Sequence, residues 1–369
     1  MKFIHIPLLS LAASGAAFAD SEDFRLDAYA HLTATLGQTS GEEGDNARHG
    51  HDPNDAFTLQ GLEFNLSPQY GEHLGASFTY NSFLDTDHKI DGEWEEAYLK
   101  LIDLPGGFNI RAGRLLNNVS TQNDLHLHSW DFVDANLITT RFLGEEGLLT
   151  NGVEVAWQMP TEQTNTLIFG FGDAVAHEHE EGHMHGPSEV AGEESAYTDN
   201  IFTFRYEGEH FVTDFQQFRY GATFITGDTG FGKSAQTYGV DFQYQWRENG
   251  IEAGGKYVKF DAEAIYRRLN YSSEDGSVTG NASEWGIYTA VGYGFAENWE
   301  LGARYGYTEG VDIMEETPEQ HRYSLALTRQ LPFTDHLDGA VRLQYNFDQR
   351  SDQDDESSLW LQFSFRFGN

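Results

Sequence analysis

Histidine is the residue type whose placement in this sequence points most directly to chemistry. Four of the fifteen histidines fall within HEHEEGHMHG at 177–186, and another H-x-H pair stands at His49 and His51. Neutral imidazole together with carboxylate is a ligand set of Zn²⁺, and it also suits Ni²⁺ or Cu²⁺. The two rings of an H-x-H pair lie on one side of an extended chain. The pattern predicts capture of Zn²⁺ or a similar divalent cation by His177, His179, His183, His185, His49 and His51.

Two alternatives stay open for these histidines. A solvated polar loop of biased composition would give the same letters at 177–186, and a flexible loop loses entropy when it closes around an ion. His126 and His128 form a further H-x-H pair and are also candidate metal ligands. They are equally compatible with luminal histidines that have found hydrogen-bond partners. No resident cofactor is required by either interpretation.

The residue types of a hydrolase also occur together, at His128, Ser129 and Asp131. Adjacent residues on an extended chain rarely face one another, and no G-x-S-x-G context surrounds Ser129. The sequence therefore does not predict an enzyme.

The composition excludes several classes of protein. The 369 residues include 59 Asp and Glu against 22 Lys and Arg, which gives a formal net charge of −37, and there is no cysteine. A nucleic-acid binder needs a basic face, and thiolate metal sites and disulfide frameworks need cysteine. Beyond the N-terminus no run of about 18 apolar residues predicts a membrane-spanning helix. High aromatic content, many glycines and few prolines favour a β-rich chain.

The N-terminal residues have the features of an export signal. Residues 1–19 read MKFIHIPLLSLAASGAAFA, with Lys2 before an apolar stretch and an A-x-A cleavage site at 17–19. This pattern predicts a cleaved secretory signal peptide over 1–19 and a mature domain over 20–369.

The elements that must position these residues are strands, because apolar and polar residues alternate almost throughout the mature chain. LDGAVRLQYNFD at 337–348 and YGVDFQYQWR at 238–247 are examples. We expect sixteen strands, over 24–36, 56–66, 72–83, 92–102, 107–115, 148–158, 165–174, 198–207, 210–226, 234–246, 250–266, 283–295, 298–309, 320–330, 336–347 and 357–367.

The connections between these strands alternate in length. Those after even strands are short, such as DLPG, EGE and RENG, whereas those after odd strands are mostly long and acidic. Trp246, Trp285 and Trp299 stand near expected strand ends, where an interfacial aromatic girdle lies. Backbone groups in hydrocarbon must all be paired, so a sheet there must close on itself. The pattern predicts an all-β transmembrane antiparallel barrel of about sixteen strands, with short periplasmic turns and long external loops.

The polar strand faces then line the lumen, and a barrel of this size admits water unless a segment blocks it. The predicted pore-lining cations are Arg111, Arg205, Arg247, Arg304, Arg342 and Arg366. The long connection 116–147 is rich in apolar residues, and we expect it to fold into the lumen. It would bring Asp131, Asp134, Glu145 and Glu146 towards these arginines, so that opposed charges across a narrowed opening select permeants.

A segment of this connection resembles one found in porin-like outer-membrane proteins of Gram-negative bacteria. HLHSWDFVDANLITTRFLGEEG at 126–147 is similar to their H-x-H-x-W-D-x-V-D element followed by R-F-x-G-x-x-G, although Leu127 and Ser129 replace the usual Pro and Ala. The histidine-rich first loop before FTLQGLEFNLS at 57–67 is a further likeness. The resemblance implies an outer-membrane barrel concerned with metal. The matching residues are His126, His128, Trp130, Asp131, Val133, Asp134, Arg141, Phe142, Gly144 and Gly147.

These observations predict an outer-membrane channel for passive passage of small solutes. Its acidic external loops favour cations. The expected partners are outer-membrane lipid and lipopolysaccharide, and small ions or solutes. The barrel-assembly machinery is a further expected partner, because LWLQFSFRFGN at the C-terminus resembles the signal that this machinery reads. No nucleic acid is expected, and homo-oligomerisation stays open. The alternative is a structural or adhesive barrel with a sealed lumen, whereas an energy-coupled transporter would need about 22 strands and a plug.

Overall fold

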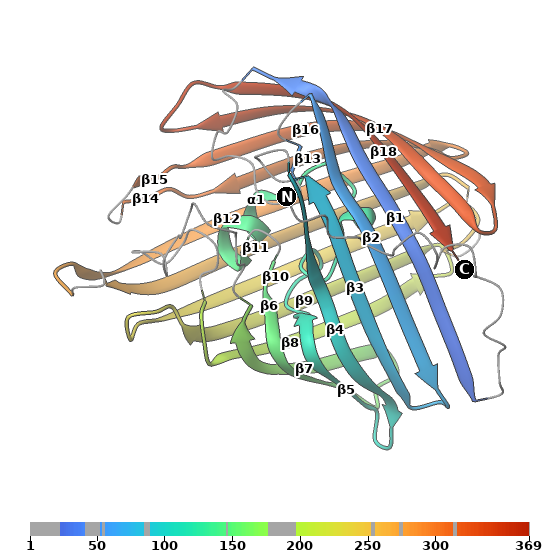
Figure 1. Ribbon diagram of the computed structural model, residues 1–369, viewed down its shortest axis with the longest axis horizontal. Coiled ribbons are helices and arrows are strands. Elements are labelled where there is room, and N and C mark those ends of the chain that lie inside the picture. The colour runs from blue at the N-terminus through green and yellow to red at the C-terminus, as the bar shows by residue number, and fades with distance from the viewer. Residues whose placement is uncertain are drawn as a thin grey trace, which may run out of the picture.

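The computed structural model describes residues 23–40, 52–53, 56–84, 89–144, 147–175, 197–251, 255–272, 276–312 and 316–368. The predicted signal peptide over 1–19 lies outside these residues. Within them, sixteen antiparallel strands close into one barrel (Figure 1), which confirms the predicted fold class and strand count. The ring closes where β1 pairs with β18, in the register Tyr29↔Gly368 to Thr39↔Ser358.

The barrel strands follow one another around the ring in chain order. They are β1 (Phe24–Thr39), β2 (Phe57–Tyr70), β3 (Leu74–Leu84), β4 (Ile90–Leu104), β5 (Phe108–Leu116), β6 (Leu149–Gln158), β7 (Thr164–Ala174), β8 (Ile201–Thr213), β9 (Gln216–Asp228), β10 (Ser234–Arg247), β11 (Tyr257–Ser272), β12 (Thr279–Ala296), β13 (Trp299–Thr308), β16 (Gln320–Thr334), β17 (Leu337–Arg350) and β18 (Glu356–Gly368). Between β13 and β16, β14 (Val311–Asp312) and β15 (Glu316–Thr317) pair as a separate small sheet.

Two turns lie further along the chain than the sequence predicted. The expected EGE turn at 207–209 is strand, and β8 turns into β9 at Asp214 and Phe215. The longer pairing brings Glu209 opposite Arg219, and the two side chains form an ion pair of 3.1 Å. Likewise β11 begins at Tyr257 rather than at 250, and the Glu248 amide donates to the Lys256 carbonyl at 2.8 Å just before that strand.

The strands are inverted relative to those of a water-soluble protein, with polar side chains buried and apolar side chains exposed. On β16, Arg322 and Ser324 are 5% and 3% exposed, whereas Tyr323 and Leu325 are 43% and 58% exposed. Side chains alternate between the two faces of a strand. The inner face of the barrel is therefore polar and packed, and the outer face is apolar, as a lipid-facing surface requires.

Aromatic side chains gather outside the barrel near its short turns. Tyr70, Phe108, Phe211, Trp299 and Phe333 are all exposed and lie at strand ends that adjoin these turns. Such a row is typical of the interfacial girdle of membrane barrels.

The connection between β5 and β6 enters the barrel. This segment, residues 117–148, is named the inner loop below, and it is described except for residues 145–146. It contains a 3₁₀ turn η1 (Leu127–Ser129) and a helix α1 (Leu137–Leu143), and Figure 1 shows α1 within the ring of strands. No helix in the described ranges is long and apolar enough to cross a membrane.

A hydrophobic core forms inside the barrel where the inner loop meets the strands. Ile138, Phe142 and Leu143 of α1 pack in one buried cluster with Ile265 of β11 and Tyr288 of β12. Burial of this apolar surface stabilises the loop against the β11–β12 side of the wall.

Candidate functional site

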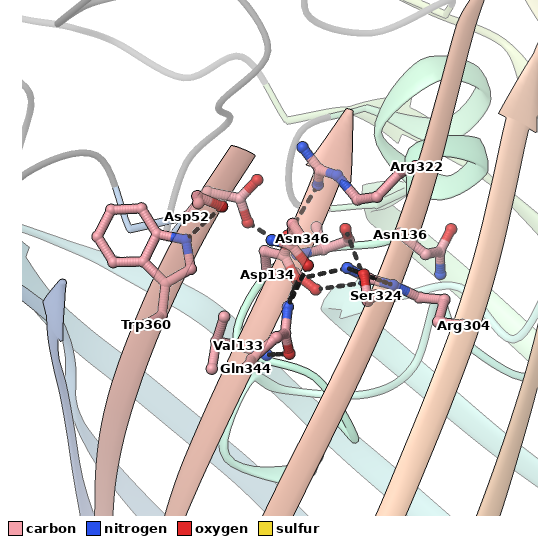
Figure 2. A network of polar contacts seen from close by, with 12 residues as sticks. Asp52, Val133, Asp134, Asn136, Arg304, Arg322, Ser324, Gln344, Asn346 and Trp360 are labelled. Carbon is pink, nitrogen blue, oxygen red and sulfur yellow. Dashed lines mark hydrogen bonds and ion pairs between the residues drawn. The ribbon is translucent and has the colours of Figure 1, made fainter. Parts of the chain in front are cut away.

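The most connected residue of the inner loop is Asp134, which lies just before α1 and meets three strands. Its carboxylate pairs with Arg304 of β13 at 2.6 Å and with Arg322 of β16 at 2.9 Å. The side-chain amides of Gln344 and Asn346 on β17 donate to its two oxygens at 2.7 and 2.9 Å (Figure 2). Burial disfavours the ionised form, but the two guanidinium groups outweigh it and hold the pKa of Asp134 below its usual range.

The backbone on either side of Asp134 is also fixed. The Val133 amide donates to Gln344 Oε1 at 2.9 Å, and the Val133 carbonyl accepts from Gln60 Nε2 at 2.7 Å. The Ala135 amide donates to Asp52 Oδ1 at 2.7 Å. The loop is therefore held to both β2 and β17 at this point.

Helix α1 is fixed by its first and last turns. The Asn136 side chain accepts from the Thr139 amide at 2.8 Å and caps the helix. Arg141, in the last turn, pairs with Glu284 of β12 at 2.7 Å, and Glu284 also pairs with the fully buried Arg267 of β11. One carboxylate thus balances two guanidinium groups under the helix.

The opposite end of the inner loop contacts β8 and β9. The Val119 carbonyl accepts from Thr223 Oγ1 at 2.6 Å and from Arg205 Nη1 at 3.3 Å. Arg205 also pairs with Asp241 of β10 at 2.6 Å. Together with the contacts above, this places the described part of the loop against walls on several sides of the lumen.

Asp131 reaches a cation other than the predicted one. It pairs with Lys259 of β11, which also contacts Glu300 of β13 at 3.0 Å. The expectation that Asp131 and Asp134 face arginines across an opening needs correction on two counts. The partner of Asp131 is a lysine, and Asp134 is in direct contact with its arginines, because the loop is pressed onto the wall rather than suspended in the lumen.

The predicted arginines divide into two groups. Arg111 donates to the Leu116 carbonyl at 3.1 Å, and Arg342 donates to the Trp130 carbonyl at 2.9 Å, so both hold the inner loop or its base, as Arg205 and Arg304 do. The second group, Arg247 and Arg366, lies over tyrosine rings near the short turns.

These two are Arg247, 4.8 Å from the Tyr257 ring centre, and Arg366, 5.3 Å from that of Tyr29. They do not belong to the loop contacts described above. Glu145 and Glu146 lie outside the described residues.

His126 lies between two carboxylates of β4. Its Nδ1 is 2.7 Å from Glu95 Oε2, and its Nε2 is 3.1 Å from Glu96 Oε2. Burial disfavours a charged imidazole, but these two hydrogen bonds outweigh it and hold the pKa of His126 well above its usual value.

His128 follows two residues later, within η1, and contacts β1 and β2. Its Nδ1 is 2.9 Å from Glu63 Oε2, and its ring stacks on that of His31 with 3.9 Å between centres. His126 and His128 therefore lie inside the barrel. The other predicted metal ligands, His49, His51, His177, His179, His183 and His185, lie outside the described residues.

The residue types of a hydrolase are not brought together here. His128 contacts Glu63, and Asp131 contacts Lys259. Among the described contacts, none joins Ser129 to either of them through its side chain.

Sequence reasoning missed several members of these networks. They are His31, Glu63, Glu95, Glu96, Lys259, Arg267, Glu284 and Arg322. The alternation of polar and apolar residues could have identified them. Glu63 stands between the apolar Leu62 and Phe64, and Arg322 is two residues from Ser324 and so lies on the same strand face. A charged residue at an inward position of such a strand is a candidate for the lumen.

Comparison with known proteins gives a fold and one distant relative. No family model matches the chain. An uncharacterized protein of Aquifex aeolicus is 25% identical over 231 residues, which are 57% of this chain and 47% of that protein. The match therefore spans about half the length of that relative.

Three solved structures share the barrel. The outer membrane channel DcaP of Acinetobacter baumannii has a TM-score of 0.58 at 11% identity, over 96% of this chain and 100% of that one. The anion-selective porin from Comamonas acidovorans has a TM-score of 0.55 at 9% identity, over 94% and 100%. OmpT, an outer membrane protein of Vibrio cholerae, has a TM-score of 0.53 at 12% identity in its trimer form, over 94% and 100%. At these identities the likeness establishes the fold.

Proposed function

We propose that this protein is a porin-like channel of the outer membrane, through which small hydrophilic solutes pass without energy coupling. The observation that carries the proposal is the inverted barrel, apolar outside and polar inside, with the inner loop folded into its lumen. A loop in this position narrows the aqueous path and sets the electrostatic field that a permeant meets. Its outer-membrane location is supported by the shared fold of DcaP and the porins, and by the export signal expected over 1–19.

The channel prefers cations in this proposal. Among the described residues, the most deeply buried charged side chains comprise twelve carboxylates and four arginines, and Arg111, Arg141, Arg342 and Lys259 lie less deeply buried beside them. Several carboxylates have cationic partners, but the carboxylates outnumber the cations, and we infer that the interior has a negative potential that raises the local concentration of cations. The same fold carries the anion-selective porin of Comamonas acidovorans, so selectivity must come from these side chains rather than from the barrel itself.

Conductance in planar bilayers tests the channel and its selectivity together. In a KCl gradient we expect discrete steps and a reversal potential displaced towards the equilibrium potential of K⁺, with the displacement shrinking as salt screens the charges. A reversal potential displaced towards that of Cl⁻ at low salt would contradict cation preference while leaving the channel intact.

A sealed structural barrel is the second candidate. Contacts of the inner loop with β2, β8, β9, β11, β12, β13, β16 and β17 favour it, because they leave the loop braced on several sides. It predicts no conductance from protein whose circular dichroism is that of a folded barrel. A variant lacking residues 120–143 should then conduct, which separates a sealed lumen from failed insertion.

The proposal extends to metal capture outside the described residues. We propose that His177, His179, His183 and His185, with His49 and His51, bind Zn²⁺ or a similar divalent ion weakly at the external mouth and release it into the lumen. Calorimetric titration of Zn²⁺ into wild type and a variant with His177, His179, His183 and His185 changed to Ala tests this. Equal heats of Zn²⁺ binding in the two proteins would mean that these four histidines are solvated residues without a metal-binding role. Contacts with lipopolysaccharide, the barrel-assembly machinery and further copies of the chain belong to the same proposal.

A further inference from the structure

The His–Glu cluster, which comprises Glu63, Glu95, Glu96, His126 and His128, differs from the other charged clusters of the lumen. In two of those clusters the carboxylate meets a permanent cation: Asp134 meets Arg304 and Arg322, and Asp241 meets Arg205. In the cluster, the carboxylates pair with imidazoles, and Glu95 and Glu96 each accept one further hydrogen bond, from Asn81 Nδ2 at 3.0 Å and from the Leu116 amide at 3.2 Å. Imidazole can be neutral, and neutral imidazole together with carboxylate is a donor set for divalent transition metals.

The geometry brings three donors from different elements to one point. Ligand atoms of Glu63 on β2, Glu95 on β4 and His126 of the inner loop all lie within 4.8 Å of one another. Ligands around a tetrahedral zinc are about 3.4 Å apart, given metal–ligand distances of about 2.1 Å. Rotamer adjustments of about an ångström would bring the three donors to that spacing.

Glu63 supplies an independent observation that points to a ligand. This residue is 2% exposed, its Oε2 contacts His128 Nδ1, and its Oε1 is buried without a hydrogen-bond partner. A buried carboxylate oxygen without a hydrogen-bond partner is energetically costly, and a bound cation would satisfy it.

His126 can offer Nδ1 to a metal ion once the proton that it shares with Glu95 is released, because Glu96 holds its other ring nitrogen. Its Nε2 lies against Glu96, while its Nδ1 lies on the side of Glu95. Metal-ligating histidines usually donate their second ring N–H to a carboxylate, which fixes the tautomer and raises the basicity of the free nitrogen. Glu96 is placed to accept that hydrogen bond.

We propose that Glu63, Glu95 and His126 form a binding site for a divalent transition-metal ion such as Zn²⁺ inside the lumen. His128 completes the coordination or leaves that position to water, and Glu96 orients His126. An ion there neutralises two buried carboxylates and ties β2, β4 and the inner loop together. The site is distinct from the histidines at 177–185, and it requires neither those residues nor conduction through the barrel.

The test uses the full chain with the six external histidines, His49, His51, His177, His179, His183 and His185, changed to Ala, so that zinc bound by those residues is removed. Calorimetric titration of Zn²⁺ into this background should find one ion per chain, and Zn X-ray absorption should show nitrogen and oxygen ligands that include imidazole. Glu63→Gln and Glu95→Gln should each weaken binding at least tenfold, and Glu96→Ala should weaken it about 10- to 100-fold. Mg²⁺, which prefers an all-oxygen shell, should not compete.

Glu300→Gln is the matched control, because Glu300 is another luminal carboxylate and contacts Lys259 instead. It should leave zinc affinity unchanged, and circular dichroism should confirm that every variant is folded. No zinc bound in the background that lacks the six external histidines would overturn the proposal. Equal zinc affinities in the background and in its Glu63→Gln variant would also overturn it. So would a loss of zinc affinity in Glu300→Gln as large as that in Glu63→Gln, because any luminal carboxylate would then serve equally well.

Discussion

At the scale of single residues, Asp134 holds the inner loop to β13, β16 and β17 at once. Its two oxygens accept from two guanidinium groups and two amides, so the buried charge is fully compensated. Removing one partner of such a pair leaves the other charge buried without compensation, which costs about 3–5 kcal/mol. The loop should therefore depend on this one carboxylate.

We expect Asp134→Asn to destabilise the packed position of the inner loop by about 3 kcal/mol, because Arg304 and Arg322 keep their charges and lose a counter-charge. Limited proteolysis should detect the release as cleavage within 117–148. The matched control is Asp338→Asn, which breaks an exposed ion pair with Arg366 of 4.0 Å. Exposed pairs contribute about 0–1 kcal/mol, so equal protease sensitivity in the two variants would contradict the assigned role of Asp134.

The pH dependence of this attachment follows from the depressed pKa of Asp134. A carboxyl whose folded pKa lies below its unfolded value of about 3.9 stabilises the fold above that value, and loses this contribution as the pH falls through the folded pKa. The stability difference between wild type and Asp134→Asn should therefore be constant from pH 7 to pH 5 and shrink only below about pH 4. Denaturant-dependent proteolysis at pH 7, 5 and 3 measures it. A difference that already shrinks between pH 7 and pH 5 would argue against an ionised Asp134.

At the scale of elements, α1 fits the wall because glycines face it. A Cβ added at Gly306 of β13 would lie 3.4 Å from Leu137, and one at Gly286 of β12 would lie 2.8 Å from Ile138. The first distance is an ordinary contact and the second is a clash. The wall is therefore hollowed beneath the helix, and the apolar face of α1 fills the space.

Two substitutions at Gly306 distinguish the effect of added side-chain volume from the effect of losing the glycine. Gly306→Ala should leave the loop in place, because its Cβ only touches Leu137. Gly306→Leu adds three further carbons into occupied space, and overpacking of this kind costs about 1–3 kcal/mol. Protease cleavage within 117–148 should rise in the leucine variant alone, and conductance should change with it. Similar behaviour of the two variants would show that α1 does not rest on this surface.

At the scale of the whole molecule, the barrel has two unlike ends. In the described residues, two-residue turns at 214–215 and 297–298 close one end, whereas the inner loop and the connection at 309–319 belong to the other. Membrane barrels place short turns in the periplasm and long loops outside. The orientation of the chain can therefore be measured directly.

The absence of native cysteine makes that measurement clean. A membrane-impermeant maleimide applied to intact cells should label Gly276→Cys, in the connection between β11 and β12, and should not label Glu248→Cys, in the turn between β10 and β11. Permeabilised cells should give labelling at both positions. Equal labelling of the two variants on intact cells would contradict the assignment of short turns to the periplasm and long loops to the outside.

The sequence by itself determined the strand count, the closure and the alternation of short and long connections. These follow from local rules: side chains alternate along a strand, and unpaired backbone cannot stay in hydrocarbon. Local rules were weaker at the turn after β8, where the pairing of Glu209 with Arg219 extended the strand beyond the expected turn.

Only the tertiary structure decided which charges meet. Glu63, Glu95 and His126 come from β2, β4 and the inner loop, and their approach depends on the register of several strands and on the path of that loop. In the same way, the pairing of Asp134 with Arg304 joins residues 170 positions apart. Composition and periodicity place such residues on the inner face of the barrel, but a contact between them is fixed by closure of the ring and by the apolar packing of α1 against β11 and β12. The physical reason is that strand periodicity acts over a few residues, whereas these contacts depend on the position of every element between them.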